Sequence, residues 1–373
     1  MNEFMNEITE NQKNWGSTMF GQDQGEFVFA HKDSNPKIEL EGLATRVYKE
    51  EKEKELLSPS AAFSEGAGNR SKVEEADEFR TCFERDRDRI KHSKVFRRLA
   101  GKTQVFIFPE DHQRTRLTHA LEVAQIALSI ASNLNLNSTL AETIALGHDC
   151  GHGPGGHASE DAFDEFLEDG FNHAIWGAEV SLRRLNLCSE TIDGIRNHSW
   201  SLPSPKTLEG EVVSWADRIA YVCHDFEDAV FAGIVSYEDL PKIVIENAGR
   251  TRAAQINSFI KDITYNSFKQ QQISMSKELA VTLGEFRDFN YKNIYLREES
   301  LENSAQVVKI LRTLTSYYLE NPKVLPFDIF QYPKEQIIKE TVNFVAGMTD
   351  TYAIHMAKKY CGIKGDFFSK NVS

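Results

Sequence analysis

The residues from 119 to 134 place apolar side chains at the spacing of an α-helix, and this pattern is the strongest restriction on the fold. Side chains three or four residues apart share one face of a helix, whereas a strand alternates apolar and polar residues. The apolar members of this run are Leu121, Val123, Ala124, Ile126, Ala127, Ile130, Ala131 and Leu134. Helical periodicity dominates the chain after residue 77, and the pattern of a strand is limited to residues 105–108. We therefore expect an all-α fold with at most a small β-hairpin.

A segment rich in glycine, histidine and carboxylates separates the predicted helices at residues 148–160. It reads His148-Asp149-Cys-Gly-His152-Gly-Pro-Gly-Gly-His157-Ala-Ser-Glu160 and holds three histidines and two carboxylates. Such a density suits neither a packed core nor an ordinary surface loop. Neutral imidazoles and carboxylates are ligands of transition metals and are also the common proton-transfer groups. The segment therefore predicts an active site built around a metal.

The helix before this segment has sequence signals at both ends. Thr139 and Glu142 have the spacing of an N-terminal capping box, and the glycines and proline after His148-Asp149 prevent the helix from continuing. The glycines at 151, 153 and 156 also match a dinucleotide-binding fingerprint. That fingerprint requires a preceding strand, whereas here a helix comes first, so we reject this interpretation.

Two residues outside the segment are candidates to complete a metal site. His119 lies on the apolar helix, and Asp217 lies on a helix predicted for residues 209–232, where it shares one face with Tyr221 and Asp225. Mixed nitrogen and oxygen ligands favour Mn, Fe, Ni, Co or Zn over Ca. A second His-Asp pair, His224-Asp225, has no comparable neighbours in the sequence.

The order His119, His148-Asp149, Asp217 resembles the HD superfamily of metal-dependent phosphohydrolases. Segments beginning at residues 83, 93, 102, 114 and 344 extend the likeness, and they are similar to bacterial dGTPase-like deoxynucleoside triphosphate triphosphohydrolases. The resemblance runs from about residue 56 to about residue 354. It implies an HD-domain helical bundle with additional helices. It also implies hydrolysis of a deoxynucleoside triphosphate (dNTP), dGTP-like, to a deoxynucleoside and tripolyphosphate.

The resemblance, together with position along the chain, gives individual residues their expected roles. The expected metal ligands are His119, His148, Asp149 and Asp217, holding a divalent ion from the set Mn, Mg, Fe, Ni, Co and Zn. The expected catalytic residues are His152, His157, Glu160 and His173. Within that set, His157 and Glu160 are three residues apart, so the carboxylate is placed to fix the imidazole tautomer. The expected substrate-binding residues are Arg98, Arg116 and Arg218 for phosphate, and Gln104, Tyr221, Asp225 and Tyr352 for the nucleoside.

Two positions depart from the family pattern. The usual Thr-Pro-Phe-Gly-His loop is Gly153-Pro-Gly155-Gly-His157 here, and Thr351 replaces the arginine that commonly follows Met-Thr-Asp. Loss of the phenylalanine removes a packing anchor, and the added glycine raises the entropy cost of ordering the loop.

Composition adds few constraints. A net charge of −13 argues against general binding to nucleic acid or anionic membranes. Five scattered cysteines form no Cys-x-x-Cys pair, and no apolar run approaches the roughly 20 residues of a membrane span, so we expect a cytoplasmic protein with no membrane partner. Nine Lys or Arg residues between Arg80 and Lys102 form a basic cluster, which either binds phosphate or is compensated by the interleaved acids.

We expect three regions: a flexible N-terminal arm (1–43), an HD phosphohydrolase core (44–235) and a C-terminal helical region (236–373) packed on the core. The resemblance implies a homo-oligomer, as a tetramer or hexamer, with a dNTP as substrate and a nucleotide or single-stranded DNA as effector. Two alternatives stay open. Another HD phosphohydrolase (a nucleotidase, a cyclic-nucleotide phosphodiesterase or a guanosine-tetraphosphate hydrolase) would keep the four metal ligands. A non-catalytic nucleotide-binding sensor would keep the site without turnover.

Overall fold

The computed structural model describes residues 8–19, 21–23, 25–107 and 113–363, which belong to two compact units, Met1–Ala44 and Thr45–Ser373. The first unit contains helix α1 (Glu10–Ser17) and the antiparallel strands β1 (Gln22–Asp23) and β2 (Val28–Phe29). These two-residue strands form the only sheet in the described part of the chain. The prediction of an all-α fold with at most a small hairpin is confirmed.

The strand pattern at residues 105–108 was a wrong prediction. Residues 105–107 are in no strand, and the nearest pairing is an isolated antiparallel bridge between Thr103 and Thr115. Phe108 lies outside the described residues. Val105, Phe106 and Ile107 line a cavity instead of joining a neighbouring strand, which explains their apolar character.

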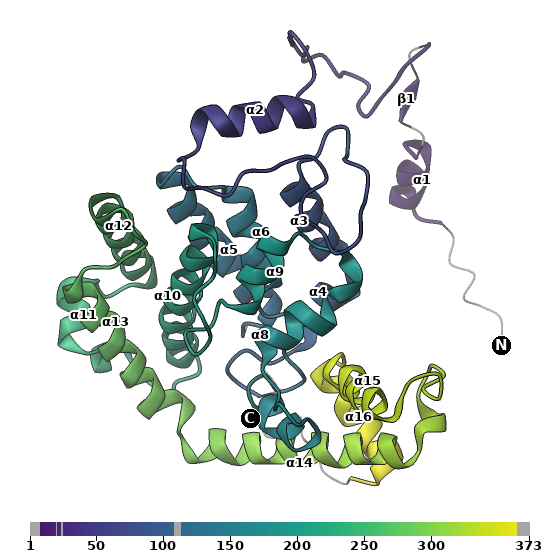
Figure 1. The fold of residues 1–373 in the computed structure, drawn as a ribbon, viewed down its shortest axis with the longest axis vertical. Coiled ribbons are helices and arrows are strands. Elements are labelled where there is room, and N and C mark those ends of the chain that lie inside the picture. Colours follow the sequence, from purple (N-terminus) through teal and green to yellow (C-terminus); the bar gives the residue numbers. More distant parts are fainter. Residues whose placement is uncertain (1–7, 20, 24, 108–112, 364–373) are drawn as a thin grey trace. The chain divides into compact units, whose positions relative to one another are not determined.

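Helices make up the second unit (Figure 1). The first half contains α2 (Arg46–Leu56), α3 (Cys82–His92), α4 (Lys94–Arg98), α5 (Arg116–Asn133), α6 (Ser138–Gly147), α7 (Ala158–Phe163), α8 (His173–Trp176), α9 (Ser189–Arg196) and α10 (Leu208–Phe231). The second half contains α11 (Lys242–Asn247), α12 (Arg252–Gln270), α13 (Lys277–Asn290), α14 (Glu298–Glu320), α15 (Lys334–Ala346) and α16 (Asp350–Cys361). Two short π-helical turns, Gly177–Ser181 and Tyr291–Tyr295, extend α8 and α13. No described helix is long and apolar enough to cross a membrane.

The larger apolar core lies among α3, α5, α6 and α10, and α5 supplies much of it. Most of the apolar run predicted for this helix is buried, whereas Leu134 is partly buried and Leu121 is 50% exposed. Side chains from α12 and α13 complete the same core. Because α5, α6 and α10 also carry or adjoin the candidate metal ligands, this core fixes the backbone positions of the site.

Helix α6 begins two residues earlier than the capping-box pattern predicted. Its N-cap is Asn137, whose side chain accepts a hydrogen bond from the backbone N–H of Leu140. The side chain of Glu142 instead forms ion pairs with Arg87 and Lys91 of α3. A tertiary contact between α3 and α6 therefore replaces the local bond that the Thr139-to-Glu142 spacing suggested.

A second apolar cluster joins α7 to the C-terminal helices α14, α15 and α16. Phe163 and Ala162 of α7 are buried against side chains that include Val307, Leu311 and Leu314 of α14. This cluster attaches residues near the C-terminus directly to the segment that follows the glycine-rich loop.

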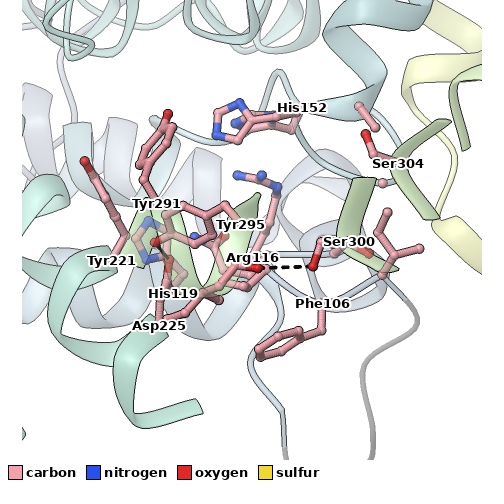
Figure 2. A pocket seen from close by; sticks show the side chains of 18 of the residues that line it. Phe106, Arg116, His119, His152, Tyr221, Asp225, Tyr291, Tyr295, Ser300 and Ser304 are labelled. Carbon is pink, nitrogen blue, oxygen red and sulfur yellow. Dashed lines mark hydrogen bonds between the residues drawn. The ribbon is translucent and has the colours of Figure 1, made fainter. Parts of the chain in front are cut away.

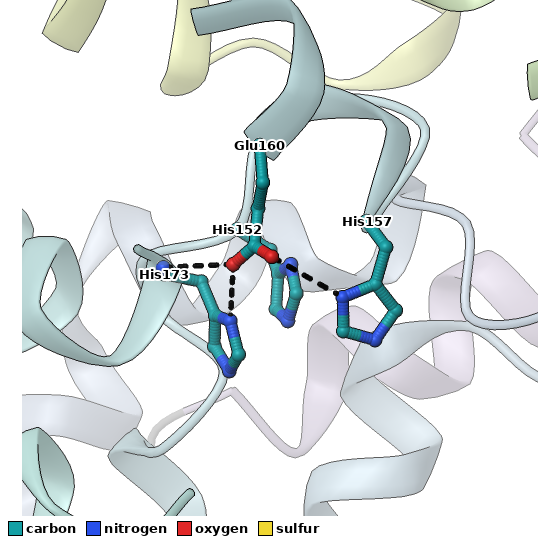
Figure 3. A group of neighbouring side chains, drawn as sticks. All are labelled: His152, His157, Glu160 and His173. Atoms are coloured by element: carbon teal, nitrogen blue, oxygen red, sulfur yellow. Dashed lines mark hydrogen bonds and ion pairs between the residues drawn. The ribbon is translucent and has the colours of Figure 1, made fainter. Parts of the chain in front are cut away.

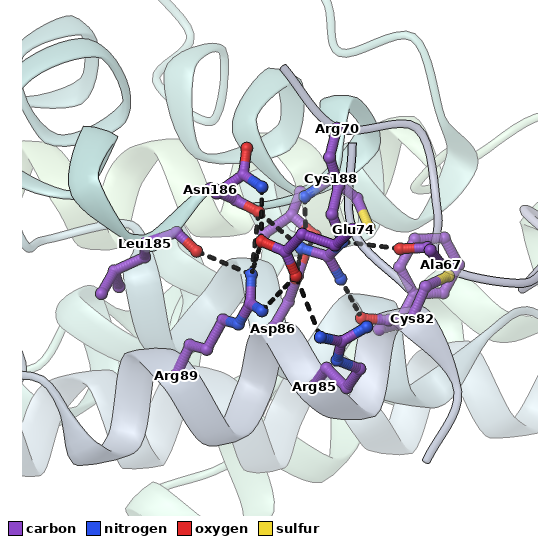
Figure 4. Close-up of polar contacts among 12 residues, drawn as sticks. Ala67, Arg70, Glu74, Cys82, Arg85, Asp86, Arg89, Leu185, Asn186 and Cys188 are labelled. Carbon is purple, nitrogen blue, oxygen red and sulfur yellow. Dashed lines mark hydrogen bonds and ion pairs between the residues drawn. The ribbon is translucent and has the colours of Figure 1, made fainter. Parts of the chain in front are cut away.

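Acidic partners compensate the basic residues of α3 (Figure 4). Arg70 and Asp86 form a fully buried ion pair at 2.5 Å, and Asp86 also accepts from the backbone N–H of Cys188. Glu74 binds both Arg85 and Arg89 at the surface of the same network. These contacts tie the loop before α3 to the loop before α9. Arg85, Arg87 and Arg89 are compensated mainly by acids outside their own stretch, Glu74 and Glu142, so these side chains serve structure.

Candidate metal centre and active site

The four expected metal ligands come from three helices that meet in the larger core. His119 lies in the first turns of α5, His148 caps the C-terminus of α6 with Asp149 next to it, and Asp217 lies on α10. Donor atoms of His119, His148 and Asp217 all lie within 4.8 Å of one another. The Asp149 carboxylate lies 3.5 Å from His148 Nε2 and 4.0 Å from His119 Nε2. The structure brings all four side chains together.

The hydrogen bonds of these residues leave nitrogen atoms without partners. His148 Nδ1 lies 2.6 Å from the carbonyl oxygen of Ala145, and because a carbonyl only accepts, Nδ1 carries the proton. Nε2 of His148 then presents a lone pair, and this buried atom has no hydrogen-bond partner among the described residues. Nδ1 of His119 is also buried without a partner. A buried lone pair is costly unless something binds it, so this group fits a metal cation.

Neighbouring charges keep both carboxyl groups of the site ionised. Burial alone would raise the pKa of Asp149, but the Arg116 guanidinium 2.8 Å away and His148 outweigh burial and hold the pKa well below its usual value. The pKa of Asp217 is also lowered against the effect of burial, because its carboxylate bonds to His119 at 3.0 Å and lies near His148. Two carboxylates are therefore available as ligands.

Three histidines surround Glu160 of α7, next to this group (Figure 3). One carboxylate oxygen accepts from the backbone N–H of His173 at 2.9 Å and from His173 Nδ1 at 2.5 Å. The other oxygen lies 3.6 Å from His157 Nδ1. These bonds lower the pKa of Glu160 although burial opposes the change. The expected pair of His157 and Glu160 is adjacent, but its carboxylate is shared, and the shorter contact is to His173.

His152 connects the four candidate metal ligands (the metal group) to the side chains around Glu160 (the histidine group). Its Nε2 lies 3.2 Å from the Asp149 carboxylate, and its ring stacks on that of His173 with centroids 3.8 Å apart. Burial and the nearby cations Arg116 and His173 hold the pKa of His152 well below its usual value, so the ring is neutral. Donor atoms of His152, His157, Glu160 and His173 also lie within 4.8 Å of one another, so this group too could hold a metal.

His198 is a site residue that the sequence pattern did not reveal. It follows α9, is 2% exposed, lines the same cavity and packs edge-on against His148 with ring centroids 5.0 Å apart. Burial lowers its pKa to about 3, and His148 and His173 add to the effect. Its only signal in the sequence is a histidine beside polar residues after a short helix, which is too common a pattern to single out.

The metal group and the histidine group open into one cavity of about 790 Å³ (Figure 2). Of the expected substrate-binding residues, Gln104, Arg116, Arg218, Tyr221 and Asp225 line it. Arg116 uses one Nη to bind Asp149, and its Nε and other Nη are buried without a partner. Buried, unpaired guanidinium N–H groups beside a cavity are suited to anionic oxygens.

Two further cavity residues were missed, Arg287 of α13 and Tyr295 of the π-helical turn. Arg287 donates to the hydroxyl of Tyr221 at 2.9 Å and stacks on Tyr291. Tyr295 donates to Asp225 at 2.5 Å, and Arg114 forms an ion pair with the other oxygen of that carboxylate. Asp225 is therefore held in place by residues 111 positions before it and 70 positions after it.

Arg98 and Tyr352, expected to contact substrate, are not among the residues that line this cavity. The guanidinium of Arg98 donates to the carbonyl oxygen of Gly347 at 3.0 Å, so it joins α4 to the turn before α16. Tyr352 is 46% exposed in the first turn of α16. A role of Arg98 and Tyr352 in substrate binding stays a prediction.

The glycine-rich loop is anchored from the C-terminal helices. Asp350 accepts from the backbone N–H of Gly155 at 2.8 Å with one oxygen, and from the backbone and hydroxyl of Thr103 with the other. The buried Lys102 donates to the carbonyl oxygens of His152 and Ala346, and burial lowers its pKa to about 8. Gly155 has φ +74°, and a Cβ there would lie 2.5 Å from Val307. The phenylalanine of the usual pattern would not fit here, and the hydrogen bonds that Asp350 accepts anchor the loop.

Replacing Asp350 with alanine is expected to lower the free energy of unfolding by about 2–6 kcal/mol. The change leaves two backbone N–H groups in a buried region without acceptors, and each costs roughly 1–3 kcal/mol. Chemical denaturation of the purified variant measures the effect. Asp239→Ala is the matched control, because this exposed carboxylate also accepts a backbone N–H, from Ser236. A loss for Asp350→Ala no greater than that of the control would contradict the anchoring role.

Comparison with known proteins places these residues inside a family pattern. The model of the HD domain matches residues 116–222, and that of the phosphohydrolase-associated domain matches residues 273–359. A deoxyguanosinetriphosphate triphosphohydrolase-like protein of Caldanaerobacter subterraneus subsp. tengcongensis is 40% identical over 341 residues, which cover 88% of this chain and 99% of that protein. A protein of the same description from Clostridium perfringens is 41% identical over 320 residues, covering 81% of this chain and 93% of the relative. A third, from Clostridium tetani, is 36% identical over 336 residues, covering 85% and 96%.

Proposed function

The chain belongs to the deoxyguanosinetriphosphate triphosphohydrolase-like proteins, whose HD domain makes it a metal-dependent phosphohydrolase, and from this premise we propose that it hydrolyses a dNTP to a deoxynucleoside and tripolyphosphate. The observation that carries the proposal is the shared cavity. One wall holds three of the candidate metal ligands, His119, Asp149 and Asp217, together with Arg116, and another presents arginines beside a carboxylate held for a sugar hydroxyl.

Unpaired arginines in this acidic chain support a polyphosphate substrate. Arg218 and Arg287 both line the cavity, and neither forms an ion pair with any described carboxylate. Arg218 lies 3.5 Å over the ring of Trp200, and burial lowers its pKa. In a protein of net charge −13, cations left without acidic partners beside a cavity favour a multiply charged anion. We assign the triphosphate to these two residues and the free N–H groups of Arg116.

The metal centre is assigned to His119, His148, Asp149 and Asp217. Two ionised carboxylates, Asp149 and Asp217, favour this group over the one around Glu160, whose single carboxylate already has two histidine partners. A divalent ion from the set Mn, Mg, Fe, Ni, Co and Zn would supply a Lewis acid for the α-phosphoryl group. The mixed nitrogen and oxygen donors select against Ca.

Proton transfer is assigned to His157, which Glu160 orients. With Nδ1–H directed to the carboxylate, Nε2 of this exposed ring is free to face substrate. A water oxygen adds to the α-phosphorus as the bond to the 5′-oxygen breaks, and protonated His157 gives its Nε2 proton to that oxygen. The proton released by the water restores His157. Asp225, held by Arg114 and Tyr295, accepts the 3′-hydroxyl of the deoxyribose.

Product analysis tests the proposal. The purified protein is incubated with each of the four dNTPs and with Mn or Mg, and the products are separated by anion-exchange chromatography. Tripolyphosphate with free deoxynucleoside supports the proposal. Pyrophosphate or monophosphate would identify another HD phosphohydrolase, and retained nucleotide without any product would identify a nucleotide-binding sensor. Assembly as a tetramer or hexamer, and activation by a nucleotide or single-stranded DNA, stay predictions that come from the family resemblance.

A further inference from the structure

His198 is a buried histidine at the cavity to which neither the sequence nor the proposed function assigns a role. Its ring lies between the two groups of the site, 5.0 Å from the ring of His148 and 5.3 Å from the ring of His173, measured between centroids. Nε2 of His198 lies 3.3 Å from Nε2 of His173. Two nitrogen atoms at this distance attract one another only if one of them carries a proton.

The partners of the other ring nitrogens show where the protons lie. Nδ1 of His198 is 2.8 Å from the carbonyl oxygen of Ile195, so Nδ1 donates and Nε2 of a neutral His198 presents a lone pair. Nδ1 of His173 donates to the Glu160 carboxylate at 2.5 Å. A neutral His173 would then present a second lone pair to His198, and the two would repel. The geometry is satisfied when His173 is protonated on both nitrogens, paired with Glu160 and donating to His198.

We propose that His198 is a positioning residue that fixes the His173 ring by accepting its Nε2–H and thereby holds Glu160 in place for His157. The inference rests on the proposed triphosphohydrolase reaction. Glu160 receives two hydrogen bonds from His173 on one oxygen, which leaves the other oxygen directed at His157. If the His173 ring turns, the side-chain bond is lost and the carboxylate is free to leave His157. His198 therefore acts on the chemical step through two intermediate side chains, without touching substrate.

The two amide replacements of His198 separate its two hydrogen bonds. Asparagine places a polar atom near the position of Nδ1, so His198→Asn keeps a donor for the Ile195 carbonyl and leaves His173 without a partner. Glutamine reaches the position of Nε2, so His198→Gln keeps a polar group against His173. Outer residues that orient a catalytic group typically contribute 10- to 100-fold to activity. We expect kcat to fall by about 10- to 100-fold in His198→Asn and by less than about 5-fold in His198→Gln.

Three readouts accompany turnover: KM for the dNTP, metal content, and a crystal structure of each variant. KM and metal content are expected to be unchanged in both variants, and Glu160 is expected to move away from His157 only in His198→Asn. Equal losses of kcat in both variants, or Glu160 unmoved in His198→Asn, overturn the proposal. Loss of metal in either variant would make His198 a ligand and would overturn it as well.

Failure of the proposed function gives a different result from failure of this inference. If the wild-type protein forms no tripolyphosphate, the assigned reaction is wrong, and the crystal structures still decide whether His198 holds Glu160. If the wild-type protein is active and both variants match it in kcat and structure, the reaction stands and the positioning role is overturned.

Discussion

Replacing His148 with alanine is expected to remove the bound metal and to reduce dNTP hydrolysis by on the order of 10³-fold or more. The lone pair of its Nε2 is buried and directed at the same small region as His119 and Asp217. Loss of one neutral ligand leaves an incomplete site, and a Lewis acid contributes several kcal/mol to the stability of the transition state. Metal analysis of the purified variant, together with kcat, measures both effects, and circular dichroism checks that the helices remain.

His224→Ala is the matched control for this variant. His224 is also a buried histidine that donates from Nδ1 to a carbonyl of its own helix, here Ala220, and it also precedes an aspartate. Among the described residues, His224 belongs to neither group of side chains that could hold a metal, so its removal is expected to keep the metal. Full metal stoichiometry in His148→Ala, or equal loss of metal in both variants, would show that these four residues are not the ligands.

The second large effect is expected from His157 and Glu160. His157→Ala and Glu160→Ala are each expected to lower kcat by about 10²- to 10⁴-fold, the usual contribution of general acid–base catalysis. The double variant is expected to lose no more than the larger single loss, because groups that act as one unit give non-additive effects. Metal content is expected to stay normal in all three variants, since neither residue is assigned as a ligand.

Glu165→Ala is the control for removal of a carboxylate near α7, because Glu165 pairs with Arg312 at the surface. Its kcat is expected to equal that of the wild type. Losses that multiply in the double variant would mean that His157 and Glu160 act separately. Loss of metal from the Glu160 variant would instead make the histidine group around Glu160 the metal site.

The sequence predicted those parts of the molecule that depend on local pattern. Helical periodicity located α5 and α10 to within a few residues, and the clustered histidines pointed to the side chains that the structure brings together. The predicted start of α6 was wrong, because the side chain of Glu142 bonds to α3 instead of to the first turn of its own helix. A bond between two helices has no signature in the local sequence.

Residues whose roles depend on packing between helices could not be identified from the sequence either. Arg287 and His198 reach the cavity only because α13 and the segment after α9 pack beside α10. Arg98, in contrast, has the residue type for phosphate binding but faces the turn at Gly347. The sequence shows the chemical type of each of these side chains. It does not show where the side chain points, because that follows from contacts between segments far apart in the chain.

The glycine-rich loop is anchored by residues of the C-terminal helices, which are made much later during synthesis of the chain. Lys102 and Thr103 bond to residues 244 and 247 positions later in the chain. At a translation rate of roughly 5–20 residues per second, the ribosome needs about 12–50 s to supply these partners after the loop residues are made. A nascent chain therefore carries all its proposed metal ligands well before its histidine loop is anchored.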